Sequence, residues 1–231
     1  MIQFRSLASS SKGNCYIVTD GATGEKLIIE AGIQVKQIKA ACDFDLGHVV
    51  GALISHEHLD HSRAAGDLIR NNIPVYASRG TTGALNIAAN VLEAGKQTRV
   101  GGFTVLPFRT MHDAAEPFGF LVRASDGDKL LFATDTVSIP VRAKCGIMAV
   151  EANFERALMH KDRLPEKLKR RIMRTHMDVQ LLCGWMSACD MSLCREIYLI
   201  HMSLMSSDEA RFVNLVRGCV PRTVKVYACK E

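Results

Sequence analysis

The stretch SHEHLDH at residues 55–61 constrains this chain more than any other feature, because three histidines and two acids directly follow the apolar run VVGALI. Buried imidazoles and carboxylates are costly unless they have partners. At the end of a strand, residues two apart point the same way, so His56 and His58 can reach one cation. Asp60 and His61 follow as the chain turns into a helix, where they can face a second cation. Nitrogen ligands mixed with a carboxylate indicate zinc, iron or manganese rather than magnesium or calcium.

One cluster cannot complete two metal sites, so further ligands must come from elsewhere in the chain. Three strand ends offer them: His112 lies shortly after FTVLPF, Asp135 after KLLFA, and His201 after EIYLI. Polar residues at the ends of apolar strands are the usual catalytic groups of layered α/β proteins. Glu57 invites comparison with the zincin motif H-E-x-x-H, but Asp60 stands at the last position and excludes that motif.

The whole chain alternates short apolar strands with helical stretches, and no linker or low-complexity segment divides it. This pattern predicts one α/β domain over residues 1–231, with the helices on the outside. The predicted strands span residues 2–7, 15–20, 26–30, 48–54, 74–78, 103–108, 118–124, 129–134, 145–150, 196–200 and 223–228. The predicted helices span residues 35–42, 62–71, 82–95, 165–173, 178–189 and 206–216.

Composition narrows the class of protein. The eight cysteines are scattered along apolar runs without a C-x-x-C pair, which is typical of reduced, mostly buried thiols. The N-terminus lacks the apolar core of a signal peptide, and no run approaches the roughly 18 apolar residues of a membrane span. We therefore expect a soluble, cytoplasmic protein without a membrane partner. The net charge of +5 is compatible with an anionic substrate.

The pattern H-x-H-x-D-H, followed by separate His, Asp and His residues, resembles the metallo-β-lactamase-fold hydrolases. Within them the chain is most similar to the YycJ/WalJ-like branch of metal-dependent exonucleases. The similarity rests on SSSKGNCYIV, IIEAG, SHEHLDH, MHDAAEPFGF, FATDT, VEANFE, THMD and IHMS, which together span nearly the whole chain. It implies a four-layer αββα sandwich with the active site at one edge, between the two sheets.

The resemblance also implies roles for individual residues. It places His56, His58 and His112 on a first metal, and Asp60, His61 and His201 on a second, with Asp135 bridging both. The expected cofactors are two divalent ions, zinc or manganese, with iron as the further candidate.

Other positions matched by the family motifs have supporting roles. Asp60, as a ligand, and His176, as the general acid for the leaving group, are the expected catalytic residues. Glu30 stands where the family usually has Asp and is expected to orient a ligand. Glu151 is a second orienting residue and Asn153 a substrate contact.

Two bound cations roughly 3.5–4 Å apart can lower the pKa of a water between them, and the resulting hydroxide attacks the substrate. No serine nucleophile is then needed, so Ser55 and Ser62 are interpreted as turn or helix-cap residues.

Between Arg156 and Arg174, eight basic residues face only two acids, and Leu164, Leu168 and Ile172 predict an inward helical face beneath them. This basic helix favours a nucleic-acid or nucleotide substrate, although a merely solvated face explains it equally well. Two alternatives to a DNA exonuclease stay open. One is a phosphodiesterase for cyclic or small nucleotides, and the other is a non-catalytic, metal-stabilised binding module.

Overall fold

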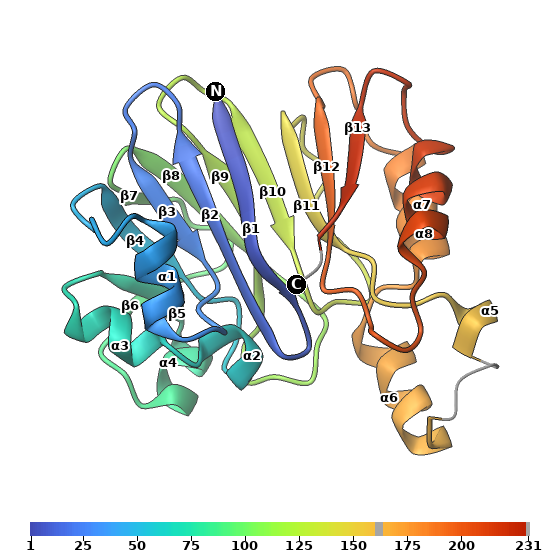
Figure 1. The fold of residues 1–231 in the computed structure, drawn as a ribbon, viewed down its shortest axis with the longest axis horizontal. Coiled ribbons are helices and arrows are strands. Elements are labelled where there is room, and N and C mark those ends of the chain that lie inside the picture. Colours follow the sequence, from blue (N-terminus) through green and yellow to red (C-terminus); the bar gives the residue numbers. More distant parts are fainter. Residues whose placement is uncertain (160–163, 230–231) are drawn as a thin grey trace.

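Two β-sheets form the middle of the molecule and share one apolar core (Figure 1). The computed structural model describes residues 1–159 and 164–229. The first sheet runs in the order β1 (Ile2–Ser10), β2 (Gly13–Asp20), β3 (Lys26–Ile29), β4 (Val49–Leu53), β5 (Val75–Ser78) and β6 (Asn90–Leu92). The second runs in the order β13 (Lys225–Ala228), β12 (Glu196–Ile200), β11 (Ile147–Glu151), β10 (Lys129–Ala133), β9 (Phe118–Arg123), β8 (Phe103–Arg109) and β7 (Thr98–Val100).

Helices cover the outer face of each sheet, which completes the expected four-layer αββα sandwich. The first sheet is covered by α1 (Val35–Ala41), α2 (Leu59–Ser62), α3 (Ala65–Arg70) and α4 (Arg79–Leu85). The second is covered by α7 (Val179–Ser187) and α8 (Glu209–Arg217). The short helix α5 (Arg156–Met159) and α6 (Glu166–Thr175) lie at one end. None of the helices in the described ranges has the length and apolar character needed to cross a bilayer.

The central strands are apolar along their whole length because both of their faces are buried. In β10, Leu130 and Phe132 pack between the sheets, whereas Leu131 and Ala133 pack under α7 and α8. Each sheet has the same plan, with an antiparallel part followed by a parallel part that begins at β3 or at β10. Parallel strands end at a common edge, so polar residues that follow them meet there.

Three of the residues at this edge have left-handed backbone conformations. Glu30 follows β3 with φ 65°, Asp135 follows β10 with φ 46°, and His201 follows β12 with φ 50°. Such conformations cost a non-glycine residue on the order of 1 kcal/mol or more and cluster at functional sites. The strand ends are therefore shaped to turn these side chains toward one another.

The predicted helix over residues 82–95 is wrong. Helix α4 ends at Leu85, Asn86 takes a left-handed conformation with φ 50°, and β6 then pairs in parallel with β5. The run of Ala, Ile and Leu in this segment fits either a helix or a strand. Residues 90–92 form a strand because they pair with the open edge of β5. Strand β7 and helix α5 were not predicted.

Helix α6 also differs from expectation. Leu168 is exposed, Leu164 and Ile172 are only half-buried, and Thr175 is the buried residue of this helix. Figure 1 shows α6 standing clear of both sheets. The predicted inward apolar face is therefore only partly buried, and α6 is a projecting basic arm.

Candidate metal centre

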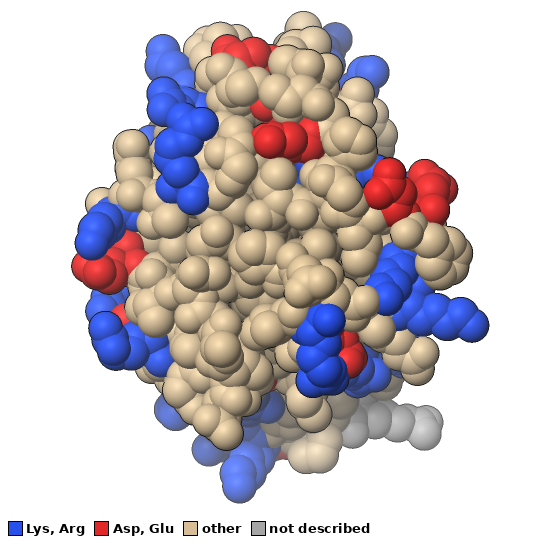
Figure 2. Space-filling view, turned by 90° about the vertical axis from the view of Figure 1, so that its left-hand side faces the viewer, with Lys and Arg blue, Asp and Glu red and all other residues tan. Residues whose placement is uncertain are grey.

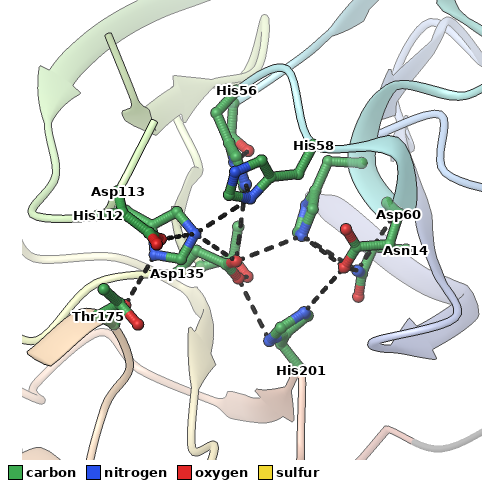
Figure 3. Close-up of polar contacts among 12 residues, drawn as sticks. Asn14, His56, His58, Asp60, His112, Asp113, Asp135, Thr175 and His201 are labelled. Carbon is green, nitrogen blue, oxygen red and sulfur yellow. Dashed lines mark hydrogen bonds and ion pairs between the residues drawn. The ribbon is translucent and has the colours of Figure 1, made fainter. Parts of the chain in front are cut away.

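Three of the predicted ligands, His56, His58 and His112, form a tight group with the Asp135 carboxylate (Figure 3). His58 Nδ1 lies 3.1 Å from His56 Nε2 and 3.3 Å from His112 Nε2. Asp135 Oδ2 lies 3.2 Å from His112 Nε2 and 3.6 Å from His56 Nε2. Ligands about 2.0–2.1 Å from a tetrahedral zinc ion are separated from one another by roughly 3.3 Å. The spacing of these four atoms therefore fits one tetrahedral cation.

A second group lies on the other side of Asp135. Asp60 Oδ2 is 3.2 Å from His61 Nε2 and 3.3 Å from His201 Nε2. The Asp135 carboxylate reaches this group as well, with Oδ2 3.5 Å from His61 Nε2 and Oδ1 3.2 Å from His201 Nδ1. The structure thus brings together all seven residues predicted as ligands, and their two groups fit a dinuclear divalent metal site.

Charge in the site supports the same conclusion. Glu30, Asp135 and Glu151 are buried, and burial opposes their ionisation. Even so, the imidazoles of His201 and His61 hold the pKa of Asp135 well below its usual range. Burial works against protonation of His201, but Asp135 and its other acidic neighbours raise its pKa to about 10. The carboxylates thus attract positive charge, which divalent cations can supply in place of protons.

The outer nitrogens of the histidines are held by neighbouring polar groups. The Ser55 hydroxyl lies 2.8 Å from His56 Nδ1, and the carbonyl of Thr175 lies 2.9 Å from His112 Nδ1. Ser62 donates to the carbonyls of Glu57 and His58. Ser62 thus caps a turn as expected, whereas Ser55 orients a candidate ligand, a role that the sequence did not indicate. Such partners fix the ring orientation of metal-binding histidines.

Glu30 supports His61, as the family motif suggests. Its Oε2 lies 3.5 Å from His61 Nδ1, and it accepts long hydrogen bonds from the Ser55 amide at 3.3 and 3.4 Å. Burial raises the pKa of Glu30, although His61 opposes this shift. The His61 Nδ1 atom makes no hydrogen bond to any described residue. Glu30, which is longer than the aspartate usual in the family, thus faces His61 without forming a hydrogen bond to it.

Glu151 joins His176 to the centre. Its Oε1 lies 2.7 Å from His176 Nδ1 and 3.1 Å from His201 Nδ1, while Oε2 accepts the amides of Thr136 and Met177. Burial works against a charged His176, but Glu151 raises the pKa of its imidazole. The ring of His176 stacks at 5.4 Å from that of His201. His176 is therefore within the site, a position that spacing alone could not establish.

Asn153 contacts His201 and does not point out of the site toward a substrate. Its side-chain amide donates to the His201 carbonyl at 2.8 Å and lies 3.2 Å from His201 Nδ1. It is buried. This geometry favours a positioning role for Asn153 over the substrate contact expected from the sequence.

Asn14 was missed by sequence reasoning. Its Nδ2 lies 3.1 Å from the Asp60 carbonyl, 3.3 Å from Asp60 Oδ2 and 3.3 Å from His61 Nε2, and Tyr16 donates to its Oδ1. Asn14 belongs to the family stretch SSSKGNCYIV, which was the signal available. An asparagine beside a β-turn is ordinarily explained by the turn alone.

We expect Gly32→Ala to disturb the centre from its outer side. A Cβ at Gly32 would lie 1.7 Å from the Asp60 carbonyl oxygen and 2.7 Å from the Asn14 amide nitrogen. Such overpacking costs about 1–3 kcal/mol and displaces the neighbouring backbone, so both unfolding free energy and metal stoichiometry should fall. Gly83→Ala is the matched control, because a Cβ there meets no atom of the described residues within 4 Å. Equal metal content in both variants would contradict the expectation.

Comparison with known proteins agrees with this geometry. A family model described as Beta-lactamase superfamily domain matches residues 26–202. Exodeoxyribonuclease YycJ of Bacillus anthracis is 32% identical over 225 residues, covering 88% of this chain and 83% of the relative. Exodeoxyribonuclease WalJ of Streptococcus pneumoniae serotype 2 is 27% identical over 187 residues, covering 72% and 68%.

Solved structures share the fold. The metallo-β-lactamase fold protein YhfI from Bacillus subtilis has a TM-score of 0.75 and 13% identity, covering 100% of this chain and 97% of that one. Human tRNase Z, short form, has a TM-score of 0.67 and 15% identity with the same coverage. The chain therefore belongs to the β-lactamase superfamily, and within it to the metallo-β-lactamase-fold branch represented by YycJ and WalJ.

Proposed function

We propose that this protein is a dinuclear-metal-dependent phosphodiesterase that degrades DNA from an end. The observation that carries the proposal is the convergence of two donor groups on the single carboxylate of Asp135. His56, His58 and His112 would hold one cation, and Asp60, His61 and His201 the other. Zinc and manganese suit these donors best, and iron is the further candidate. Such a pair of cations supplies an activated water and neutralises charge on the phosphate oxygens.

The leaving oxygen of a phosphodiester needs a proton, and we assign its donation to His176. Its Nδ1 is engaged by Glu151, which leaves Nε2 as the donor toward a substrate. The side chain is 14% exposed, and its ring centroid is 5.1 Å from that of His112. Glu151 therefore acts as a positioning residue that orients both His176 and His201.

Helix α6 supports a nucleic-acid substrate. It is attached to the centre by an ion pair from Arg171 Nε to Asp113 Oδ2 at 2.7 Å, next to the His112–Thr175 contact. Arg170 and Arg174 are exposed and make no ion pair within the part of the chain that the structure describes. Two further basic residues of this segment, Lys161 and Arg163, lie outside the described residues. A projecting basic arm beside the candidate metal centre can follow a phosphate backbone.

The curated relatives point the same way, since YycJ and WalJ are both named exodeoxyribonucleases. We place the activity in the cytoplasm. This is supported by the eight cysteines, all of them free thiols, as expected of a protein in a reducing compartment.

The double variant Arg170→Ala/Arg174→Ala should bind DNA about tenfold more weakly than wild type at low salt. The slope of the logarithm of the binding constant against the logarithm of the salt concentration should be smaller in magnitude by about 1.8. The reason is that each lost phosphate contact removes one released counterion. Fluorescence anisotropy at several salt concentrations measures both quantities. Arg99→Ala/Arg123→Ala is the charge-matched control on strands β7 and β9. If both double variants show the same slope, α6 is an ordinary solvated helix.

The proposed function is tested by incubating end-labelled double-stranded DNA with the purified protein and Mn²⁺, with and without EDTA. Stepwise shortening that EDTA abolishes is the expected result. If DNA stays intact but cyclic or small nucleotides are hydrolysed, the substrate is a small nucleotide that binds at the same centre. Metal binding without hydrolysis of any phosphodiester would indicate a metal-stabilised binding module.

A further inference from the structure

A pocket of about 380 Å³ lies on the outer side of the candidate metal centre. It is formed by the turn between β1 and β2, the segment after Glu30, and the end of α2. Its polar lining consists of Lys12, Gln34, Gln37 and Arg63, together with the backbone at Gly13 and Gly32; the other lining residues are apolar and none is acidic.

The pocket shares a backbone wall with Asp60. Gly32 lines the pocket, and its backbone lies so close that a Cβ would overlap the Asp60 carbonyl oxygen at 1.7 Å. Gly13 lines it beside Asn14, which donates to that same carbonyl. The pocket is thus separated from a candidate ligand of the second metal by the thickness of one polypeptide strand.

The pocket and the basic arm α6 lie on opposite sides of the candidate metal centre. Figure 3 shows Thr175 and Asp113, the attachment points of α6, on one side of the centre and Asp60 with Asn14 on the other. In Figure 1, α6 and α2 likewise lie on opposite sides of the same edge. Basic side chains therefore lie on both sides of the candidate metal centre, an arrangement that suits a nucleic-acid strand passing across it.

The donors in the pocket suit a phosphate. Arg63 offers a planar fork that matches two phosphate oxygens, and Lys12 adds a second positive charge. Arg63 is exposed and forms no ion pair with an acid in residues 1–159 or 164–229. Figure 2 shows Lys and Arg side chains at the margins of a broad uncharged area on the left-hand side of the molecule as drawn in Figure 1, including its lower end.

We propose that this pocket is a subsite for the substrate phosphate adjacent to the scissile phosphodiester, with Arg63 as its main anchor and Lys12 as a second cation. The proposal rests on the proposed function and specifies its substrate as a chain of at least two successive phosphates. The strand then runs from α6 across the centre and into the pocket. A substrate with one phosphate reaches the metals without using the subsite.

The test compares Arg63→Ala with Arg99→Ala, which removes the same charge from the distant strand β7. Binding of a fluorescein-labelled single-stranded oligonucleotide is measured by anisotropy in EDTA, where no cleavage occurs. We expect Arg63→Ala to weaken binding about three- to tenfold and to lower the salt slope by about 0.7 relative to the control. Arg63→Lys keeps the charge and should restore the slope.

A second measurement separates the subsite from the catalytic centre. Hydrolysis of bis(p-nitrophenyl) phosphate, which has one phosphate, should be equal in wild type and Arg63→Ala, while hydrolysis of DNA at limiting concentration should fall in parallel with binding. If the wild type degrades DNA and Arg63→Ala matches Arg99→Ala in affinity, slope and rate, the subsite is refuted and the proposed function stands. If the wild type neither binds nor hydrolyses DNA, both proposals fall together.

Discussion

The variant Asp135→Ala is expected to lose at least about a thousandfold in kcat/KM on DNA and to bind fewer than two metal ions while remaining folded. Its carboxylate lies within reach of both donor groups, at 3.2 Å from His112 Nε2 and 3.5 Å from His61 Nε2. Metal ions supply several kcal/mol of transition-state stabilisation, and each 1.4 kcal/mol corresponds to about a factor of ten in rate. Metal stoichiometry by elemental analysis and rates on DNA should therefore fall together.

The effect of losing the Asp135 carboxylate must be distinguished from the effect of alanine on the backbone conformation. Asp135 has φ 46°, so alanine there adds a backbone cost of about 1–2 kcal/mol. Asp43 has φ 55°, and its side chain makes no hydrogen bond or ion pair with another residue in the described ranges. It lies in the loop after α1, which makes Asp43→Ala the matched control. Asp135→Asn is the complementary variant, since asparagine tolerates the left-handed conformation but binds metal poorly. Two bound metal ions per chain in Asp135→Asn would contradict the bridging role of Asp135.

The second large effect is expected for His176→Ala, with a loss in kcat on DNA of about a hundredfold or more. The proposed role concerns the leaving group, so the loss should depend on how much that group needs a proton. Bis(p-nitrophenyl) phosphate releases p-nitrophenolate, which leaves without protonation. On this substrate, His176→Ala should differ from wild type only a few-fold.

Glu151→Gln provides the companion variant for His176. Glutamine keeps an acceptor for the amides of Thr136 and Met177, but it no longer offers a carboxylate to His176 and His201. A loss of about 10–100-fold in rate or metal affinity is expected when such an orienting carboxylate is removed. An equal loss on both substrates in His176→Ala would show that this histidine supports the metals instead of protonating the leaving group.

Much of the site could be predicted because its chemistry lies at strand ends. Continuous apolar runs identified β4, β10 and β12, and the residues following them were the candidate ligands. The motif at residues 55–61 is local, so its four candidate ligands are visible as one cluster in the sequence. The sandwich and the assignment of ligands to two metals came from resemblance to a family.

Errors occurred where local pattern is ambiguous. Residues 82–95 contain small and apolar side chains that fit either a helix or a strand, yet Asn86 ends α4 and β6 completes the edge of the first sheet. Leu164, Leu168 and Ile172 have helical spacing, yet Leu168 is exposed and the other two are only half-buried, because α6 projects from the body. Periodicity indicates that an element exists, but not what it contacts.

The sequence by itself determined the kind of chemistry, since the identities of the metal-binding side chains and their places after apolar strands are local properties. Only the tertiary structure decided which groups support them. Asn14 meets Asp60 across 46 positions and Arg171 meets Asp113 across 58. The pocket between Lys12 and Arg63 likewise forms only when a hairpin turn packs against α2. The physical reason is that hydrogen bonds, ion pairs and cavities form between segments brought together by packing of the sheets, and such contacts leave no periodic signal along the chain.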